Sequence, residues 1–596
     1  MLPFLYLINP ASELISYFKI NFEIYFYYYV LLLAALILAI VIAFSSIVKY
    51  LPKINKSSLK ILALIIIAFF ASELLFVAPF HLIYNDEYIY ESIAKTMLYQ
   101  HEFGICSFSN QLYCIPGTIG FFHQPGGWPL IESLGFSIFG VSSNVAFNTN
   151  LVFGALSILL VFMISIELFR DEGAAILSSL VFSFLPLFDT YVRTAIPDVS
   201  TMLFELLTIY LGLSYMRTKK TSIGVATVFA ASYTLVTKVD GIIVIPILLL
   251  LFIANRNIFE GRAARNQIRI FGILAVLFIL ASTPALIFTY IANSHSFGAN
   301  ISAGQTKFGL SYLGNNTVNN ALFFLGTYDS MRVSKYNYVY HVEFPVEITL
   351  LGMIGLIYLG RRGMHRELLF LVGWFALVFV FYSSYYAGST LYGLGVDTRY
   401  YLADFASLSI MAGVGGSYLY SKVVHGINGP SKNAYIKKQY IAVFFAILII
   451  SQSLSQFITI VSLPPSKIAT YSAERADESF LLQQYAKIPS GCAVVTFKAP
   501  FWYVMNRSNV YASWLSLPQY QQQIQNISHG CLYFDYGISC YINSTEQGNP
   551  QNTRSTCNAI MSEYVIQPVS TYNYKQYGWN VTFGLYKLLS KRNETT

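Results

Sequence analysis

Long apolar segments alternate with short polar ones through most of this chain. Many of these segments approach the ~20 residues that an α-helix needs to cross a bilayer. The pattern predicts twelve helices, at residues 23–48, 60–80, 144–169, 174–191, 198–216, 222–237, 240–255, 269–292, 344–360, 367–386, 400–420 and 440–461. We therefore expect a polytopic α-helical membrane protein. Residues 60–461 would form its core, and segment 1–59 would add one further helix.

Residues 462–596 differ from the rest and predict one soluble domain. Two prolines, Pro464 and Pro465, follow the last apolar segment. Apolar and polar residues alternate at 492–497 and 564–567, as they do in strands, whereas 474–487 predicts a helix. We expect a small C-terminal α/β domain. Two other long segments, 81–143 and 293–343, interrupt the membrane core and are predicted to be ordered loops, because loops of this length usually carry function or elements of their own.

Composition supports the membrane assignment, and charge predicts its orientation. The chain is 55% hydrophobic and 11% charged, whereas soluble domains carry about 25% charged residues. Most basic loop residues fall on alternate loops, which are therefore predicted to be cytoplasmic. The short connections on the other side carry only Arg193, Lys238 and Arg399. The net charge of +8 thus reflects topology rather than nucleic-acid binding, and both termini are predicted to lie outside.

All six cysteines fall on the predicted outer side. Two of them, Cys106 and Cys114, lie in the first long loop, and the other four lie in the tail. An oxidising outer compartment allows disulfides. Cys106 and Cys114 are a candidate pair, whereas the sequence leaves the pairing within the tail open.

Charged residues near the hydrocarbon layer are costly and therefore mark candidate functional sites. Asp86 and Glu87 directly follow the second apolar segment. A carboxylate at this place can act as a general base on an acceptor hydroxyl or hold a divalent metal. Asp86 can equally cap the helix that follows it, and the sequence allows both roles.

Two further outer segments carry candidate ligands. His123 and Gln124 lie in a Pro- and Gly-rich turn before a predicted surface helix. His123 could donate a hydrogen bond to a phosphate, or it could be a structural histidine. Arg193 lies just before Pro197 and Asp198. An arginine suits bidentate phosphate binding, although Arg193 could instead pair with Asp198, which could itself be only a helix-end charge.

The last candidates are two short charged segments. Lys238 and Asp240 separate the sixth and seventh predicted helices, and a second group directly precedes the eleventh: Asp397, Arg399 and Tyr400. A phosphate leaving group needs cations of this kind, although an arginine here could also reach lipid headgroups. Together these segments predict a site where cations hold a donor phosphate and a carboxylate activates an acceptor. This scheme requires no metal, but Glu87 and His341 are candidate ligands for a divalent ion.

The order and spacing of these segments resemble the superfamily of dolichyl-phosphate-mannose protein mannosyltransferases and aminoarabinose (lipid A) transferases, which has the GT-C fold. The matching pieces are Asp86-Glu87-Tyr88 with Ala94 and Met97-Leu98, His123-Gln124-Pro125 with Phe139-Gly140, Arg193 with Pro197-Asp198, Thr237-Lys238 with Pro246, and Asp397-Thr398-Arg399-Tyr400.

The resemblance implies an inverting glycosyltransferase that uses a polyprenyl-phosphate-linked sugar. Its acceptor would be a protein, lipid or glycan on the outer face. Asp86 would be the catalytic base, with Glu87 and Asp198 positioning substrates or a metal. This chain departs from the family where Gly126 replaces a second proline, and where the loop 293–343 is too short for a β-trefoil domain. Both departures favour the plasma membrane of an archaeon or bacterium.

Two other functions fit parts of the sequence. An oligosaccharyltransferase would share the fold class, but the tail carries Asp535-Tyr536-Gly537 without the tryptophan pair of that family's motif. A lipid-linked sugar transporter or flippase would show repeated halves and charges near the bilayer midplane. Here the charges lie at helix ends, which favours the transferase.

Overall fold

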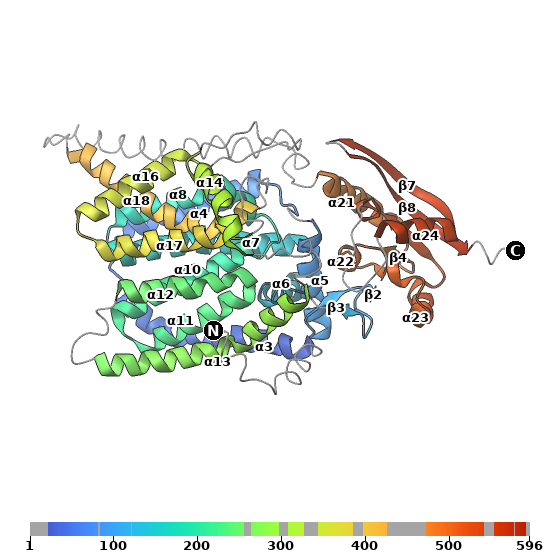
Figure 1. Cartoon of the computed structure of the whole chain (residues 1–596), viewed down its shortest axis with the longest axis horizontal. Coiled ribbons are helices and arrows are strands. Elements are labelled where there is room, and N and C mark those ends of the chain that lie inside the picture. Colours follow the sequence, from blue (N-terminus) through green and yellow to red (C-terminus); the bar gives the residue numbers. More distant parts are fainter. Residues whose placement is uncertain are drawn as a thin grey trace.

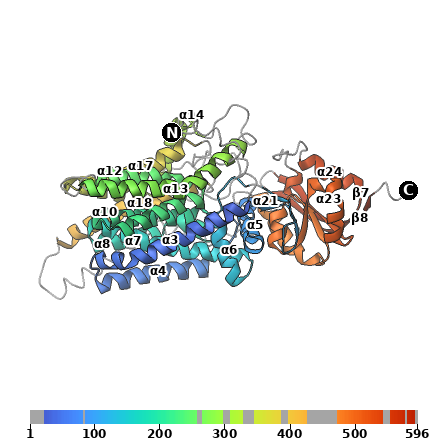
Figure 2. The same ribbon diagram turned by 90° about the horizontal axis from the view of Figure 1, so that it is seen from below.

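The computed structural model describes residues 22–81, 84–120, 122–255, 264–296, 308–326, 344–385, 397–425, 472–541, 553–576 and 579–591. A bundle of helices runs along the long axis, and an α/β unit lies at one end of it (Figure 1). The same arrangement is seen from below (Figure 2). The bundle helices are α3 (Phe22–Tyr50), α4 (Lys56–Phe76), α7 (Ser143–Phe169), α8 (Glu172–Ser183), α9 (Pro186–Val192), α10 (Asp198–Thr218), α11 (Thr221–Thr237), α12 (Val244–Ala254), α13 (Ala264–Ser296), α14 (Leu310–Phe324), α16 (Val346–Arg361), α17 (His365–Ser383) and α18 (Leu402–His425).

Seven helices in the described part of the chain are long and apolar enough to cross a membrane, and three shorter apolar helices accompany them. This confirms an integral membrane protein that is mostly helical. Each of the first eleven predicted segments contains a helix, and the twelfth, 440–461, lies outside the described residues. The exposed faces of α3, α4 and α13 carry large apolar side chains, as expected of helices that face lipid.

One predicted helix is divided in the structure. The segment 174–191 forms two helices, α8 and α9, with a break at Phe184 and Leu185. The following residue is Pro186, which lacks an N–H and disfavours a helical residue before it. The short helix α9 then leads into the outer turn that carries Arg193. A similar interruption precedes α12, where residues Val239–Ile243 form the 3₁₀ helix η1.

The tail folds around a six-stranded mixed sheet with the strand order β2-β5-β4-β6-β8-β7. Its central strands β4, β5 and β6 are parallel, whereas β8 and β7 form a long antiparallel hairpin. The elements of the tail are α21 (Ser472–Gln484), η5 (Tyr485–Lys487), β4 (Ala493–Thr496), α22 (Ala499–Val504), β5 (Ser508–Tyr511), η6 (Ala512–Trp514), α23 (Pro518–Ser528), β6 (Leu532–Tyr536), η7 (Ile538–Cys540), α24 (Thr553–Glu563), β7 (Tyr564–Gln576) and β8 (Trp579–Lys591).

The first outer loop joins the bundle to the tail unit. It contains α5 (Tyr84–Gln100), α6 (Gly127–Phe139) and the short strands β1 (Ile105–Cys106), β2 (Phe108–Asn110) and β3 (Ile119–Gly120). Strand β2 pairs with β5 and so completes the edge of the tail sheet. Most side chains of α5 are buried, because this helix lies between the bundle and the tail unit (Figure 1).

Three disulfides lie within the first long loop and the tail. Cys106 and Cys114 are bonded within the first loop. In the tail, Cys492 pairs with Cys531 and Cys540 with Cys557, and these are the two pairings that the sequence left open. The Cys492–Cys531 bond joins the starts of the neighbouring parallel strands β4 and β6.

Candidate active site

The outer turn before α10 is held from three sides. Glu87, which is buried, accepts a hydrogen bond from the backbone N–H of Ala195 at 2.6 Å. The indole N–H of Trp128 donates to the carbonyl of Ala195 at 2.9 Å. The amide of Asn150 in α7 donates to the carbonyls of Thr194 and Ile196. Because α10 begins directly after this turn, these contacts fix the position of Asp198 at its N-terminus.

A second outer turn packs against the end of α11. A Cβ on Gly127 would lie 2.5 Å from the carbonyl oxygen of Val236, so only glycine allows this approach. The phenol of Tyr233 donates to the Gly127 carbonyl at 2.9 Å. The side-chain oxygen of Gln124 accepts from the backbone N–H of Val239 at 3.2 Å. The Pro- and Gly-rich segment therefore orients the residues on either side of Lys238.

Four charged side chains meet at the end of these helices and form what we call the cation cluster: Asp198, Lys238, Asp240 and Arg399. The ammonium group of Lys238 lies 2.9 Å from Asp198 and 2.6 Å from Asp240. The Nε of Arg399 lies 4.0 Å from Asp198. Tyr400 joins the cluster, because its ring lies beneath both cations, 4.7 Å from the Lys238 ammonium and 5.1 Å from the Arg399 guanidinium carbon.

The cation cluster contains a lysine whose charge is stabilised by its neighbours, together with polar atoms that have unused hydrogen-bonding capacity. Burial opposes the charge on Lys238, but Asp198 and Asp240 outweigh it and raise the pKa of the amine. The two carboxylates therefore favour the charged form of Lys238. The Nε of Arg399 and the Oδ2 of Asp198 are buried without a hydrogen-bond partner among the described residues. Buried polar atoms are normally paired, so these two atoms leave the cluster with hydrogen-bonding capacity for a further group.

Asp86 lies within electrostatic reach of the cation cluster. Its side chain is partly exposed. Burial, followed by the negative charges of Asp86 and Asp198, raises the pKa of the Tyr90 hydroxyl one helical turn further along α5. Glu474, on tail helix α21, responds to the same carboxylate. Burial, opposed by Lys498 and reinforced by Asp86, raises the pKa of Glu474 to about 7. The tail thus contributes an ionisable group, Glu474, near Asp86. The sequence did not predict this, because the two residues lie far apart along the chain.

Arg193 lies in different surroundings from those the sequence suggested. Its side chain is buried, and it donates to the Val77 carbonyl at 3.4 Å and to the Asn148 side chain at 3.0 Å. Within the described part of the chain, no hydrogen bond or ion pair joins Arg193 to the cation cluster. Asp198 pairs instead with Lys238 and Arg399. Arg193 therefore ties the outer turn to α4 and α7.

The remaining predicted site residues are placed as follows. His123 is exposed beside the ring of Phe122. Asp397 begins the 3₁₀ helix η4 (Asp397–Tyr401), the element that presents Arg399 and Tyr400. His341 lies outside the described residues. Within the described ranges, no group of three or more His, Cys, Asp or Glu side chains is arranged to hold a metal ion.

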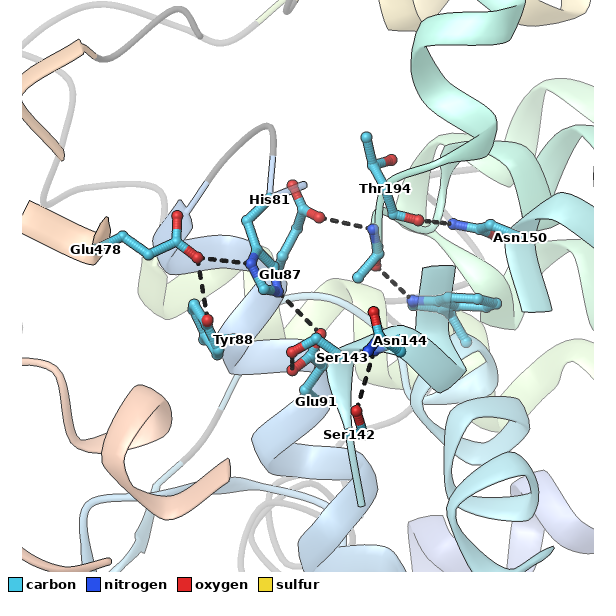
Figure 3. A network of polar contacts seen from close by, with 12 residues as sticks. His81, Glu87, Tyr88, Glu91, Ser142, Ser143, Asn144, Asn150, Thr194 and Glu478 are labelled. Atoms are coloured by element: carbon cyan, nitrogen blue, oxygen red, sulfur yellow. Dashed lines mark hydrogen bonds and ion pairs between the residues drawn. The ribbon is translucent and has the colours of Figure 1, made fainter. Parts of the chain in front are cut away.

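A separate polar network connects the first loop to the tail, and we call it the clasp: His81, Tyr88, Glu91 and Glu478 (Figure 3). The two ring nitrogens of His81 lie 2.8 Å from Glu478 and 3.0 Å from Glu91. The phenol of Tyr88 donates to Glu478 at 3.0 Å, and Ser143 donates to Glu91 at 2.7 Å. All four members of the clasp are buried. The sequence gave no signal for this network, because Glu478 lies about 400 residues away from its partners along the chain.

Comparisons with known proteins bear on the class of this site. Residues 123–288 match the family model of dolichyl-phosphate-mannose-protein mannosyltransferases. A comparison with curated proteins finds no match. Among solved structures, ArnT from Cupriavidus metallidurans in the apo state superposes with a TM-score of 0.53 at 12% identity, covering 89% of this chain and 97% of that one.

Two other solved structures have lower scores. ArnT from the same organism bound to undecaprenyl phosphate has a TM-score of 0.49 at 11% identity, covering 89% of this chain and 97% of that chain. The oligosaccharyltransferase of Archaeoglobus fulgidus in the apo form has a TM-score of 0.47 at 13% identity, covering 88% and 74%.

The superposition on ArnT shows a shared fold, and residues 123–288 are similar to the mannosyltransferase family, so the chain resembles membrane glycosyltransferases with the GT-C fold. The matched segment includes His123, Gln124, Arg193, Asp198 and Lys238. The resemblance that the sequence motifs predicted is therefore confirmed over this part of the chain.

Proposed function

We propose that this protein transfers a sugar from a polyprenyl-phosphate-linked donor to a hydroxyl-bearing acceptor on the outer face of the membrane, with inversion. The acceptor is a protein, a lipid or a glycan. The observation that carries this proposal is the cation cluster, with its unpartnered Arg399 and Asp198 atoms, within reach of a partly exposed carboxylate at Asp86. The matched family supports the donor class, because its printed description names dolichyl-phosphate-mannose.

The reaction follows from this geometry. The acceptor hydroxyl attacks the anomeric carbon and forms the new glycosidic bond, while its proton passes to Asp86. The bond between the anomeric carbon and the phosphate oxygen breaks, and polyprenyl phosphate leaves. Negative charge grows on that phosphate, and Lys238 and Arg399 stabilise it because they are held in place before the reaction begins.

An apolar groove supports a lipid donor. It lies between α11, α12 and α13, and its walls are almost entirely apolar, with Val228, Leu248 and Phe278 among them. Helices α11 and α12 are the two that Lys238 connects through η1. A polyprenyl chain in this groove would therefore lie beside the same two helices that present the cation to its phosphate.

The test is a transfer assay with the full-length protein in lipid nanodiscs. Radiolabelled polyprenyl-phosphate sugars serve as donors and a membrane extract supplies the acceptors. We expect the wild type to label a product, and Asp86→Asn to lower the rate by about 10²–10⁴-fold, the usual contribution of a general base. Glu563→Gln, which changes an exposed carboxylate of the tail, is the control and should leave the rate unchanged.

Two results would contradict the proposal. Turnover of Asp86→Asn close to that of the wild type would remove Asp86 as the base. If the folded protein binds the lipid but transfers no monosaccharide from any donor, an oligosaccharyltransferase-type enzyme or a lipid-linked sugar transporter would become the better assignment.

A further inference from the structure

A cavity of about 510 Å³ lies where the first loop and α7 meet the tail unit. Its volume falls within the range of small-molecule sites, about 300–1,000 Å³. The walls combine aromatic rings with polar side chains. The lining residues that matter here are Phe80, Tyr88, Ser143, Asn144, Arg475 and Tyr485.

This cavity is distinct from the site at Asp86. Tyr88 lines the cavity, whereas Asp86 and Tyr90 interact with the cation cluster. Residues two apart on an α-helix point in nearly opposite directions, because each residue turns the helix by about 100°. The two sites therefore lie on opposite faces of α5, and a sugar bound in the cavity is not at the reacting centre.

The two basic side chains of the cavity that we compare, His81 and Arg475, differ in how fully their polar atoms are paired. The charge of His81 is balanced by Glu91 and Glu478 within the clasp. Arg475, three residues before Glu478 on α21, differs, although Glu478 also lines the cavity and favours the arginine's charge. Its guanidinium stacks on the ring of Phe80 at 4.4 Å, and its buried Nη1 has no hydrogen-bond partner in the described ranges. A guanidinium fixed in this way offers donors that match a carboxylate.

We propose that this cavity binds an acidic sugar, meaning a saccharide residue that carries a carboxylate. Arg475 would hold the carboxylate. The ring of Tyr485 would contact the apolar face of the sugar ring, and the side chain of Asn144 would bond to its hydroxyls. An aromatic ring and an amide group in one cavity suit a ring with one apolar and one polar aspect, rather than a bare anion.

The binding site does not depend on the transfer reaction. If the proposed function is correct, the bound acidic sugar is a remote part of an acidic glycan acceptor. Only this role as part of an acceptor rests on the proposed function. The binding experiment below reads ligand occupancy without turnover. Failure of one proposal is therefore distinguishable from failure of the other.

The test measures binding of D-glucuronate to the full-length protein in nanodiscs, by calorimetry and by saturation-transfer NMR. D-glucose and inorganic phosphate are the comparison ligands. We expect wild type and Asp86→Asn to bind glucuronate equally, and Arg475→Gln to bind it about tenfold more weakly or worse, as expected for loss of a charged hydrogen bond. Arg554→Gln, an exposed arginine of the same unit, is the matched control and should bind like the wild type. Both comparison ligands should bind about tenfold more weakly than glucuronate.

Three outcomes would overturn the proposal. Unchanged affinity in Arg475→Gln would remove the arginine from the site. Phosphate binding as tight as glucuronate binding would show a general anion site. Absence of glucuronate binding to the folded wild type would leave no acidic-sugar site. If Arg475→Gln fails to fold, as judged by its melting temperature, Tyr485→Leu replaces it and should weaken glucuronate binding while D-glucose binding stays negligible.

Discussion

The two faces of α5 carry carboxylates that resemble each other in sequence and differ in their surroundings. On one face, Asp86 is partly exposed and lies near the cation cluster, where buried atoms lack partners. On the other, Glu91 is fully buried, and both of its oxygens are hydrogen-bonded within and beside the clasp. A saturated network has no capacity left for a substrate. The comparison assigns the proposed transfer to the first face and structural support to Glu91 on the second, where Arg475 and not the clasp carboxylates would bind a ligand.

The largest expected effect comes from removing one member of the clasp, which tests whether this network has a structural role. Glu478→Gln would leave the buried His81 with one balancing carboxylate instead of two. Breaking a buried ion pair typically costs about 3–5 kcal/mol. We expect the tail unit to become sensitive to limited proteolysis and its melting temperature to fall. Glu563→Gln is the exposed control. An unchanged proteolysis pattern would contradict the structural assignment.

The clasp also predicts a pH dependence. Burial opposes the charge on His81, but Glu478 and Glu91 raise its pKa well above the usual value. Its stabilisation is therefore complete below the unfolded pKa of about 6.5 and is lost as pH rises through the raised folded pKa. Burial opposes the charge on Glu478 too, but His81 lowers the pKa of this carboxyl. Its contribution is lost as pH falls through that lowered value. His81→Asn should flatten the alkaline part of this dependence.

The third prediction concerns the cation cluster. Arg399→Gln keeps the length of a hydrogen-bonding side chain but removes its charge. We expect the transfer rate to fall about 10²-fold or more, as when a preorganised group that stabilises developing charge is lost. Arg366→Gln, which changes an exposed arginine in the first turn of α17, should have little effect. Equal effects of the two changes would mean that Arg399 is only an interfacial anchor.

Much of this architecture could be predicted from the chain, because apolar periodicity and motif order are local properties. Lys238, Asp198 and Arg399 were grouped by the resemblance, and the structure places them within one cluster. Arg193 was grouped with them as another basic residue on a short predicted outer connection and as part of the same resemblance. The intervening turn reverses the chain, however, and the arginine is directed to Asn148.

The contacts between the loop and the tail could not be predicted. Both Glu478 and Glu474 lie on a helix whose packing against α5 depends on the whole tail sheet. Strand β2, which completes that sheet, is only three residues long, too short for a periodic pattern to appear. The sequence therefore identified the charged side chains of the cation cluster, but not Glu474 and Glu478, which the tail brings to α5.

Glu87 extends the comparison of the α5 carboxylates. It is next to Asp86 in sequence, but it accepts a hydrogen bond from the turn at Ala195. Glu87→Gln can still accept the backbone hydrogen bond, although without its charge. We expect a loss of about 1–3 kcal/mol in stability, the usual cost of weakening a buried polar contact. Any loss of activity should follow the folded fraction, measured by melting in nanodiscs. A rate loss as large as that of Asp86→Asn, in a protein of unchanged stability, would assign Glu87 to the reaction.

The smallest expected effect comes from Lys95, on the face of α5 that contacts the tail. Its buried ammonium donates to the carbonyls of Gln111 and Tyr503 and to the side chain of Asn506, at 2.5–2.7 Å. Burial lowers the pKa of this amine to about 7. Above that pH the unfolded chain binds one more proton than the folded one, so stability should rise with pH, by up to about 1.4 kcal/mol per unit. Lys95→Met should remove this rise between pH 7 and 9, and Lys487→Met, an exposed lysine, should not. Parallel melting curves for wild type and Lys95→Met would show instead that the three acceptors keep the amine charged throughout this range.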